Sequence, residues 1–173
     1  EAAGSTFWAT VRLQRVPDAG EATMPDAGDR PREIIASLYK GQRVLVADDD
    51  PMTQEVEALL LQDAGLVADL ASNGREAVEK AGSGRHAMIL MDVEMPVMNG
   101  LDAARAIRKL PGLQHIPILA LTGDTQEAGA QCAAAGMDER AVKPMQPADF
   151  YANVLRLLQR PDRVESTPMT IPA

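Results

Sequence analysis

Six polar side chains, each following a short apolar run, have the chemistry that phosphoryl transfer requires. They are Asp48, Asp49, Asp50, Asp92, Thr122 and Lys143. Carboxylates at close range repel one another, so their pKa values rise unless a cation neutralises them. Hard oxygen ligands favour Mg²⁺, which takes one or two carboxylates together with phosphate oxygens. A carboxylate in such a site can attack phosphorus to form an aspartyl phosphate, while a lysine and a hydroxyl hold the transferring oxygens.

The elements that must bring these side chains together alternate along the chain. Apolar runs typical of buried strands are each followed by a helix-like stretch. The expected strands are Arg43–Ala47, Leu66–Leu70, Ala87–Met91, Ile116–Leu121 and Asp138–Val142, and the expected helices are 51–64, Asn73–Ala81, Leu101–Leu110, Thr125–Ala135 and Pro147–Gln159. This order predicts an α/β fold with a flavodoxin-like (βα)5 doubly wound parallel sheet and strand order 2-1-3-4-5. The residues after different strands then meet at one edge of the sheet.

Four segments of the chain resemble the receiver domain of two-component signalling, the response-regulator fold. They are VLVADDDP, MILMDVEMPVMNG, LALTGD and AVKPM, in order and at fitting separations between about Gln42 and Gln159. The resemblance implies a phosphorelay, in which a phosphohistidine donates its phosphoryl group to an aspartate with Mg²⁺ bound. It also implies that the domain catalyses only its own phosphotransfer and dephosphorylation. The implied partner is the dimerisation and phosphotransfer domain of a histidine kinase, or a histidine phosphotransfer protein.

The resemblance assigns the acidic residues to two roles. Asp92 matches the phosphoacceptor. Asp48 and Asp49 match the acidic pair that binds Mg²⁺ together with Asp92, with Asp49 the direct ligand and Asp48 acting through water. The family also uses a backbone carbonyl two residues after the phosphoacceptor, which in this chain belongs to Glu94.

The remaining matches concern the switch. Thr122 matches the switch hydroxyl, Lys143 matches the family's lysine, and a cis peptide bond is implied between Lys143 and Pro144. Three residues before the lysine, where receivers often carry an aromatic residue, this chain has Arg140. This departure predicts a relay station rather than an output switch that couples through an aromatic side chain.

The ends of the chain indicate a larger protein. Residues 1–16 contain Gly4–Leu13, which resembles the last strand of a histidine-kinase ATP-binding domain. Residues 17–41 are rich in Pro, Gly and Ala and are expected to be a linker with a short helix over Arg32–Lys40. The expected receiver domain is residues 42–160, and the expected flexible tail is residues 161–173. The chain is therefore interpreted as the C-terminal receiver of a hybrid histidine kinase. Its expected location is cytoplasmic, including the cytoplasmic part of a membrane-bound sensor kinase.

Three other functions fit parts of the pattern. A Mg²⁺-dependent aspartyl-phosphate phosphatase shares the strand-end aspartates, and Glu94 has the spacing of its general acid, but no cap domain is evident. A DNA-binding regulator needs an output domain, and only 14 residues follow Gln159. This alternative therefore requires a receiver from a regulator whose output domain is truncated. A flavodoxin-type FMN binder is disfavoured because only 3 % of the residues are aromatic.

Composition sets further limits. The formal net charge is −8, from 17 Lys and Arg against 25 Asp and Glu, and it argues against a nucleic-acid surface. No apolar run has the roughly 20 residues that span a membrane, so no direct membrane contact is expected.

Several polar residues and the one cysteine are expected to have a structural role or to lie at the surface. Asp50 is expected to be a helix cap, Cys132 a small buried side chain, Glu55, Glu57 and Glu76 solvated helix charges, and His86 and His115 surface residues.

Overall fold

The structure, a computed structural model, describes residues 30–123 and 128–160. The predicted strand within Gly4–Leu13, the tail 161–173 and the first residues of the helix predicted from Thr125 lie outside these ranges. The described helices are α1 (Arg30–Leu38), α2 (Pro51–Asp63), α3 (Gly74–Ala81), α4 (Gly100–Ile107), α5 (Ala128–Ala134) and α6 (Pro147–Leu158). The strands are β1 (Arg43–Ala47), β2 (Val67–Ala71), β3 (His86–Asp92), β4 (Ile118–Thr122) and β5 (Glu139–Val142). No helix in the described ranges is long and apolar enough to cross a membrane.

The five strands form one parallel sheet in the order β2-β1-β3-β4-β5, so the predicted fold class and strand order are confirmed. Asp92 pairs with Leu121 across the β3–β4 ladder, and Thr122 pairs with Val142 across the β4–β5 ladder. The last residues of three neighbouring strands therefore lie at one edge of the sheet, where the sequence pattern placed the polar groups.

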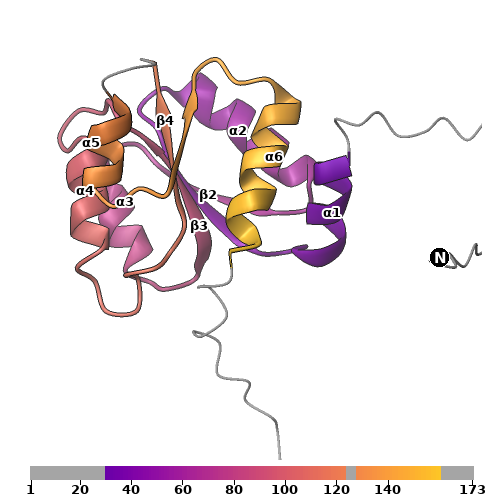
Figure 1. Ribbon diagram of the computed structural model, residues 1–173, viewed down its shortest axis with the longest axis horizontal. Helices are drawn as coiled ribbons and strands as arrows, with labels where there is room; N and C mark the ends of the chain where they lie inside the picture. The colour runs from indigo at the N-terminus through magenta and orange to yellow at the C-terminus, as the bar shows by residue number, and fades with distance from the viewer. Residues whose placement is uncertain (1–29, 124–127, 161–173) are drawn as a thin grey trace, which may run out of the picture.

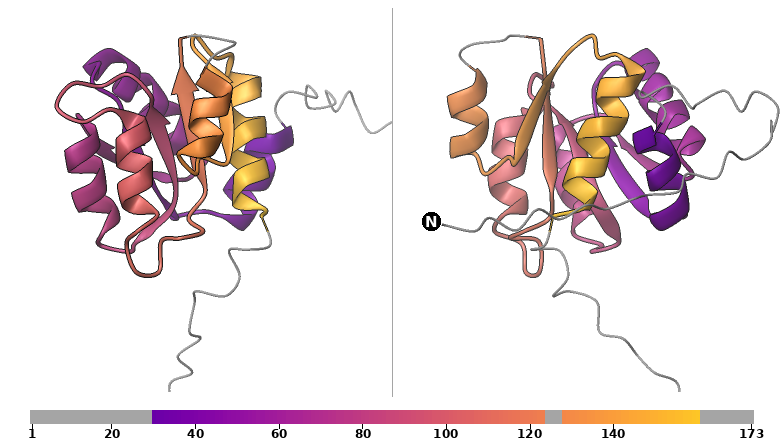
Figure 2. Two further views of the ribbon diagram at one scale, coloured as in Figure 1. Left: turned by 60° about the vertical axis from the view of Figure 1, so that its left-hand side comes forward. Right: turned by 45° about the vertical axis from the view of Figure 1, so that its right-hand side comes forward.

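The two faces of the sheet are covered by two different sets of helices (Figures 1 and 2). Helices α3, α4 and α5 cover one face, and their small side chains pack against alternate strand residues such as Leu45 and Ile89. Helices α1, α2 and α6 cover the other face, where Val44 and Leu90 meet Phe150. Because successive strand residues point to opposite faces, a strand buried on both faces is apolar at nearly every position. This explains why β1, β3 and β4 could be found in the sequence as continuous apolar runs.

Helix boundaries follow from capping residues. Asp50 caps α2 and accepts hydrogen bonds from the backbone N–H groups of Met52 and Thr53, at 3.3 and 3.1 Å, as predicted. Asn73 and Asn99 cap α3 and α4 through their side-chain oxygens. An Asn cap precedes the first helical residue, which is why α3 begins at Gly74 rather than at the predicted Asn73.

Helix α1 lies in the stretch where a short linker helix was expected, and it packs onto the rest of the fold. The side chain of Ile35 is fully buried among residues of α6 such as Val154 and Leu157. At the end of α2, Asp63 accepts hydrogen bonds from Arg32 of α1 at 3.4 Å and from the Tyr151 hydroxyl of α6 at 3.0 Å. Helix α1 is thus held by both helices of this face (Figure 1).

The first residue of α4 approaches the end of β3 so closely that only glycine fits at position 100. A Cβ atom added to Gly100 would lie 2.0 Å from the carbonyl oxygen of Asp92. We expect Gly100→Ala to lower the free energy of unfolding by about 2 kcal/mol or more, because backbone rather than a flexible side chain must move. Urea unfolding measures this change, and Gly123→Ala, whose added Cβ meets nothing within 4 Å, is the control. Equal stability of the two variants would contradict the close approach.

Candidate functional site

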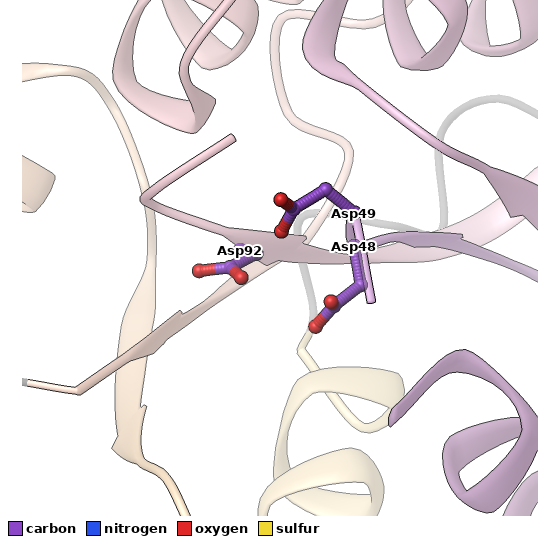
Figure 3. Close-up of side chains that lie close together, drawn as sticks. All are labelled: Asp48, Asp49 and Asp92. Carbon is purple, nitrogen blue, oxygen red and sulfur yellow. The ribbon is translucent and has the colours of Figure 1, made fainter. Parts of the chain in front are cut away.

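The structure brings together three carboxylates from two neighbouring strands. Asp48 and Asp49 directly follow β1, and Asp92 is the last residue of β3. Each offers a carboxylate oxygen, and these oxygens all lie within 4.8 Å of one another (Figure 3). Asp48 and Asp92 are buried, whereas Asp49 is exposed. Three hard oxygen donors at this spacing, one of them open to water, match the donor set that Mg²⁺ prefers.

Lys143 joins this cluster from the end of β5. Its ammonium group donates hydrogen bonds to Asp48 Oδ2 and, at 2.7 Å, to Asp92 Oδ2. Burial alone would lower the pKa of Lys143, but the hydrogen bonds to these two carboxylates and their negative charges together raise the pKa above its ordinary value. The lysine therefore stays charged and holds two acidic side chains that would otherwise repel each other.

The second oxygens of Asp48 and Asp92 are held by the backbone. Asp48 Oδ1 accepts from the N–H of Asp50 at 2.9 Å, and Asp92 Oδ1 accepts from the N–H of Glu94 at 3.1 Å. Burial raises the pKa of Asp92, although its hydrogen bonds to Lys143 and Glu94 oppose the shift. A carboxylate that is partly desolvated yet kept in one orientation is suited to act as a nucleophile.

Two further predicted residues lie near this cluster in the fold. Thr122 is the last residue of β4 and is buried, and its carbonyl accepts from the N–H of Lys143 at 2.9 Å. The peptide bond between Lys143 and Pro144 is cis, as the resemblance implied. The side chain of Glu94 is exposed and is not one of the three clustered carboxylates, so the role expected of its backbone carbonyl stays a prediction.

The side chain of Arg140 lies against α5. A Cβ atom added to Gly129 would be 3.3 Å from the Arg140 guanidinium carbon, so the side chain lies across that helix. Arg140 is exposed at the position where the family often has an aromatic residue. Its effect on switching stays a prediction.

Two residues of α2 next to the site were not found from the sequence. Gln54 is buried, and its amide donates to the carbonyls of Asp48 at 2.7 Å and Ala71 at 2.8 Å, which ties the ends of β1 and β2 together. The expectation that Glu57 is a solvated charge was wrong: its side chain is buried, with 6 % of the residue exposed. Burial, and next the charge of Asp48, raise the pKa of Glu57 to about 8.

The expectation that His86 is a surface residue in a loop was also wrong. His86 begins β3, its side chain is 1 % exposed, and its Nε2 lies 3.1 Å from Asp69 Oδ2. The predicted strand, Ala87–Met91, begins one residue late because His is not typical of buried strands, and it ends one residue before Asp92. Cys132 is buried in α5, as expected.

Comparisons with known proteins agree with this fold. The family model of the response regulator receiver domain matches residues 44–155. The chain therefore belongs to the response regulator receiver family of two-component signalling.

Three relatives illustrate the range of the family. Hybrid signal transduction histidine kinase B of Dictyostelium discoideum is 33% identical over 129 residues, which are 68% of this chain and 7% of that protein. The chain thus spans less than a tenth of the length of that relative. Chemotaxis protein CheY4 of Vibrio cholerae is 35% identical with a TM-score of 0.65, over 68% of this chain and 98% of that one. The receiver domain of sensor histidine kinase PA1611 of Pseudomonas aeruginosa, described with a magnesium ion coordinated in its active-site cleft, is 34% identical with the same TM-score and coverage.

Proposed function

We propose that this chain accepts a phosphoryl group from a phosphohistidine onto Asp92, with Mg²⁺ bound by Asp48, Asp49 and Asp92. The observation that carries the proposal is the cluster of three carboxylates, bridged by Lys143 across Asp48 and Asp92. The Glu94 backbone carbonyl is proposed as a further ligand. Bound Mg²⁺ would neutralise the negative charge that gathers on the transferring phosphoryl oxygens.

The residues of the chain divide the remaining work. An oxygen of Asp92 forms the new bond to phosphorus as the P–N bond of the phosphohistidine breaks, and the electron pair leaves with the imidazole nitrogen, which takes a proton from water. The ammonium of Lys143, which now donates to Asp92, then donates to a phosphoryl oxygen. The hydroxyl of Thr122 donates to another oxygen. Such transfer depends mainly on position and charge, which these groups supply.

The wider setting is proposed from the relatives. We infer that the chain is part of a hybrid histidine kinase and works in the cytoplasm, since hybrid kinases are among its relatives. The donor is then the kinase's own phosphotransfer domain or a histidine phosphotransfer protein. With Arg140 in place of an aromatic residue, the domain is proposed to pass the phosphoryl group on as a relay.

Labelling with a small phosphodonor tests the function. After incubation with acetyl phosphate and Mg²⁺, we expect intact-mass measurement to show one added phosphoryl group per chain. Asp92→Asn should abolish this addition, because an amide is not a nucleophile for phosphorus. Labelling that persists in Asp92→Asn would overturn the assignment, and steady turnover of phosphate esters would favour the phosphatase alternative.

A further inference from the structure

A groove beside the carboxylate cluster has the size and the lining of a small-molecule site. It has a volume of about 410 Å³ and runs between α2 and the segment that links β5 to α6. Sites for small organic ligands typically measure roughly 300–1,000 Å³ and are mostly apolar, with a few polar groups that fix the orientation of the ligand. The walls of this groove are mainly apolar and include Met52, Val56, Leu60, Met145 and Phe150. The groove therefore suits a ligand with an apolar body.

One polar group in the wall of the groove lacks a partner. Glu57 lines the groove, only 6 % of this residue is exposed, and its Oε2 atom has no hydrogen-bond partner among the described residues. Buried polar atoms in folded proteins nearly always have a partner, so an exception in the wall of a groove points to a ligand that supplies one. The last torsion of a glutamate side chain is broad, so either carboxylate oxygen can turn toward that ligand.

The charges around Glu57 favour a positively charged ligand. Burial raises the pKa of Glu57, the carboxylates of Asp48 and Asp92 raise it further, and the ammonium of Lys143 opposes them. This ammonium donates its hydrogen bonds to Asp48 and Asp92. Once ionised, Glu57 adds a third carboxylate to the two that share one ammonium, and a cation in the groove restores the balance of charge.

A guanidinium group meets these conditions better than an ammonium group. It is planar, its N–H donors match both oxygens of a carboxylate, and it is more weakly hydrated, so it loses less when it leaves water. An aryl or alkyl group attached to it can lie along the apolar walls, as the stem of an arginine side chain does on apolar surfaces. A neutral ligand would leave ionised Glu57 without a counter-charge.

We propose that this groove binds small amphiphilic cations, whose apolar body packs between α2 and Met145 and whose guanidinium group pairs with the carboxylate of Glu57. At neutral pH, Glu57 gives up its carboxyl proton to the solvent as the cation enters, and no other bond is formed or broken. The inference goes beyond the phosphoacceptor function, because it requires neither a phosphoryl group nor Mg²⁺. A failure to label Asp92 with acetyl phosphate would leave it untouched.

Phenethylguanidinium and its uncharged isostere phenethylurea test the proposal in Mg²⁺-free buffer at pH 7. In methyl NMR titrations we expect the guanidinium to bind about tenfold more tightly than the urea, with the largest shifts at the methyl groups of Met52 and Met145. Glu57→Gln should weaken guanidinium binding about tenfold and leave urea binding unchanged, since it removes only the charge. Glu55→Gln, at an exposed position of α2, is the matched control and should bind both probes as the wild type does.

Calorimetry in two buffers of different ionisation enthalpy measures the proton. The wild-type chain should release about one proton per bound guanidinium at pH 7, and Glu57→Gln should release none. Equal affinity for the two probes, guanidinium binding that Glu57→Gln does not weaken, or binding without proton release would each overturn the proposal. Methyl shifts confined to residues outside the groove would also overturn it. If Glu57→Gln does not fold, Glu57→Leu provides the same comparison and should lose the preference for the guanidinium.

Discussion

Replacing Lys143 by Met is expected to slow labelling of Asp92 by acetyl phosphate about a hundredfold or more. The ammonium group of Lys143 is the one observed link between Asp48 and Asp92 among the described residues, and it is placed to donate to the transferring phosphoryl group. Loss of a single donor that stabilises charge in a transition state typically lowers a rate by two to three orders of magnitude, about 3 kcal/mol. Met keeps most of the side-chain volume, so the change removes mainly the charge.

Rates from intact-mass time courses at saturating Mg²⁺ check this prediction. Lys109→Met is the control, because Lys109 is exposed and lies just after α4, away from the carboxylates. The one-dimensional proton spectrum of each variant must show dispersed methyl signals, so that unfolding is not mistaken for lost chemistry. A folded Lys143→Met protein that is labelled within a few-fold of the wild-type rate would contradict the role given to this lysine.

Replacing Glu57 by Leu is expected to stabilise the fold, and more so at higher pH. The pKa of Glu57 is about 8 in the folded chain, against an ordinary value of 4.5. Between these values the folded state holds a proton that the unfolded state has released, so wild-type stability falls as the pH rises from about 4.5 to 8. Leu has no proton to lose. The gain near pH 8 is on the order of 3 kcal/mol and shrinks toward pH 5.

Urea unfolding at pH 5, 6, 7 and 8 without Mg²⁺ measures this difference. Titrating groups that do not interact with Glu57 contribute equally to both proteins and cancel when the variant is compared with the wild type. Glu55→Leu is the matched control on the same helix, because Glu55 is exposed. A stability difference that does not change between pH 5 and 8 would mean that Glu57 is not desolvated in the folded chain.

Much of the fold could be predicted because the sheet is buried on both faces. Continuous apolar runs such as Met88–Met91 indicate strands that are buried on both faces of a sheet. The polar residue that follows each run marks the edge of the sheet where the carboxyl ends of the strands lie side by side. Asp48, Asp92 and Lys143 are far apart in sequence, yet the strand order alone brings them to one edge. That is why the carboxylates of the site could be predicted from the residues directly after each strand.

The error at Glu57 arose because two residue patterns compete in α2. In α2, the apolar residues Met52, Val56 and Leu59 have helical spacing, and so do Gln54, Glu57 and Leu61. Composition favours the first set as the buried face, but the structure buries the second. The run Leu59–Leu61 contributes apolar residues to both faces, so the buried face of α2 is determined only by how the helix packs on the sheet. A glutamate on the buried face contradicts the usual preference for apolar side chains, and such contradictions are common at functional sites.

The place of α1 also bears on where a phosphodonor can be tethered. Arg32 meets Asp63 at the far end of α2, whereas Asp50 at the near end adjoins the carboxylates. A helix of 13 residues is about 20 Å long, so the end of α2 that contacts α1 lies about this far from the end beside the carboxylates. In the proposed hybrid kinase, a donor domain joined to α1 must therefore cover a distance of about 20 Å to reach Asp92 while α1 remains packed on α6. If donor and acceptor are joined in one polypeptide as proposed, a short tether holds them at a millimolar effective concentration, which favours transfer within that polypeptide over exchange between separate molecules.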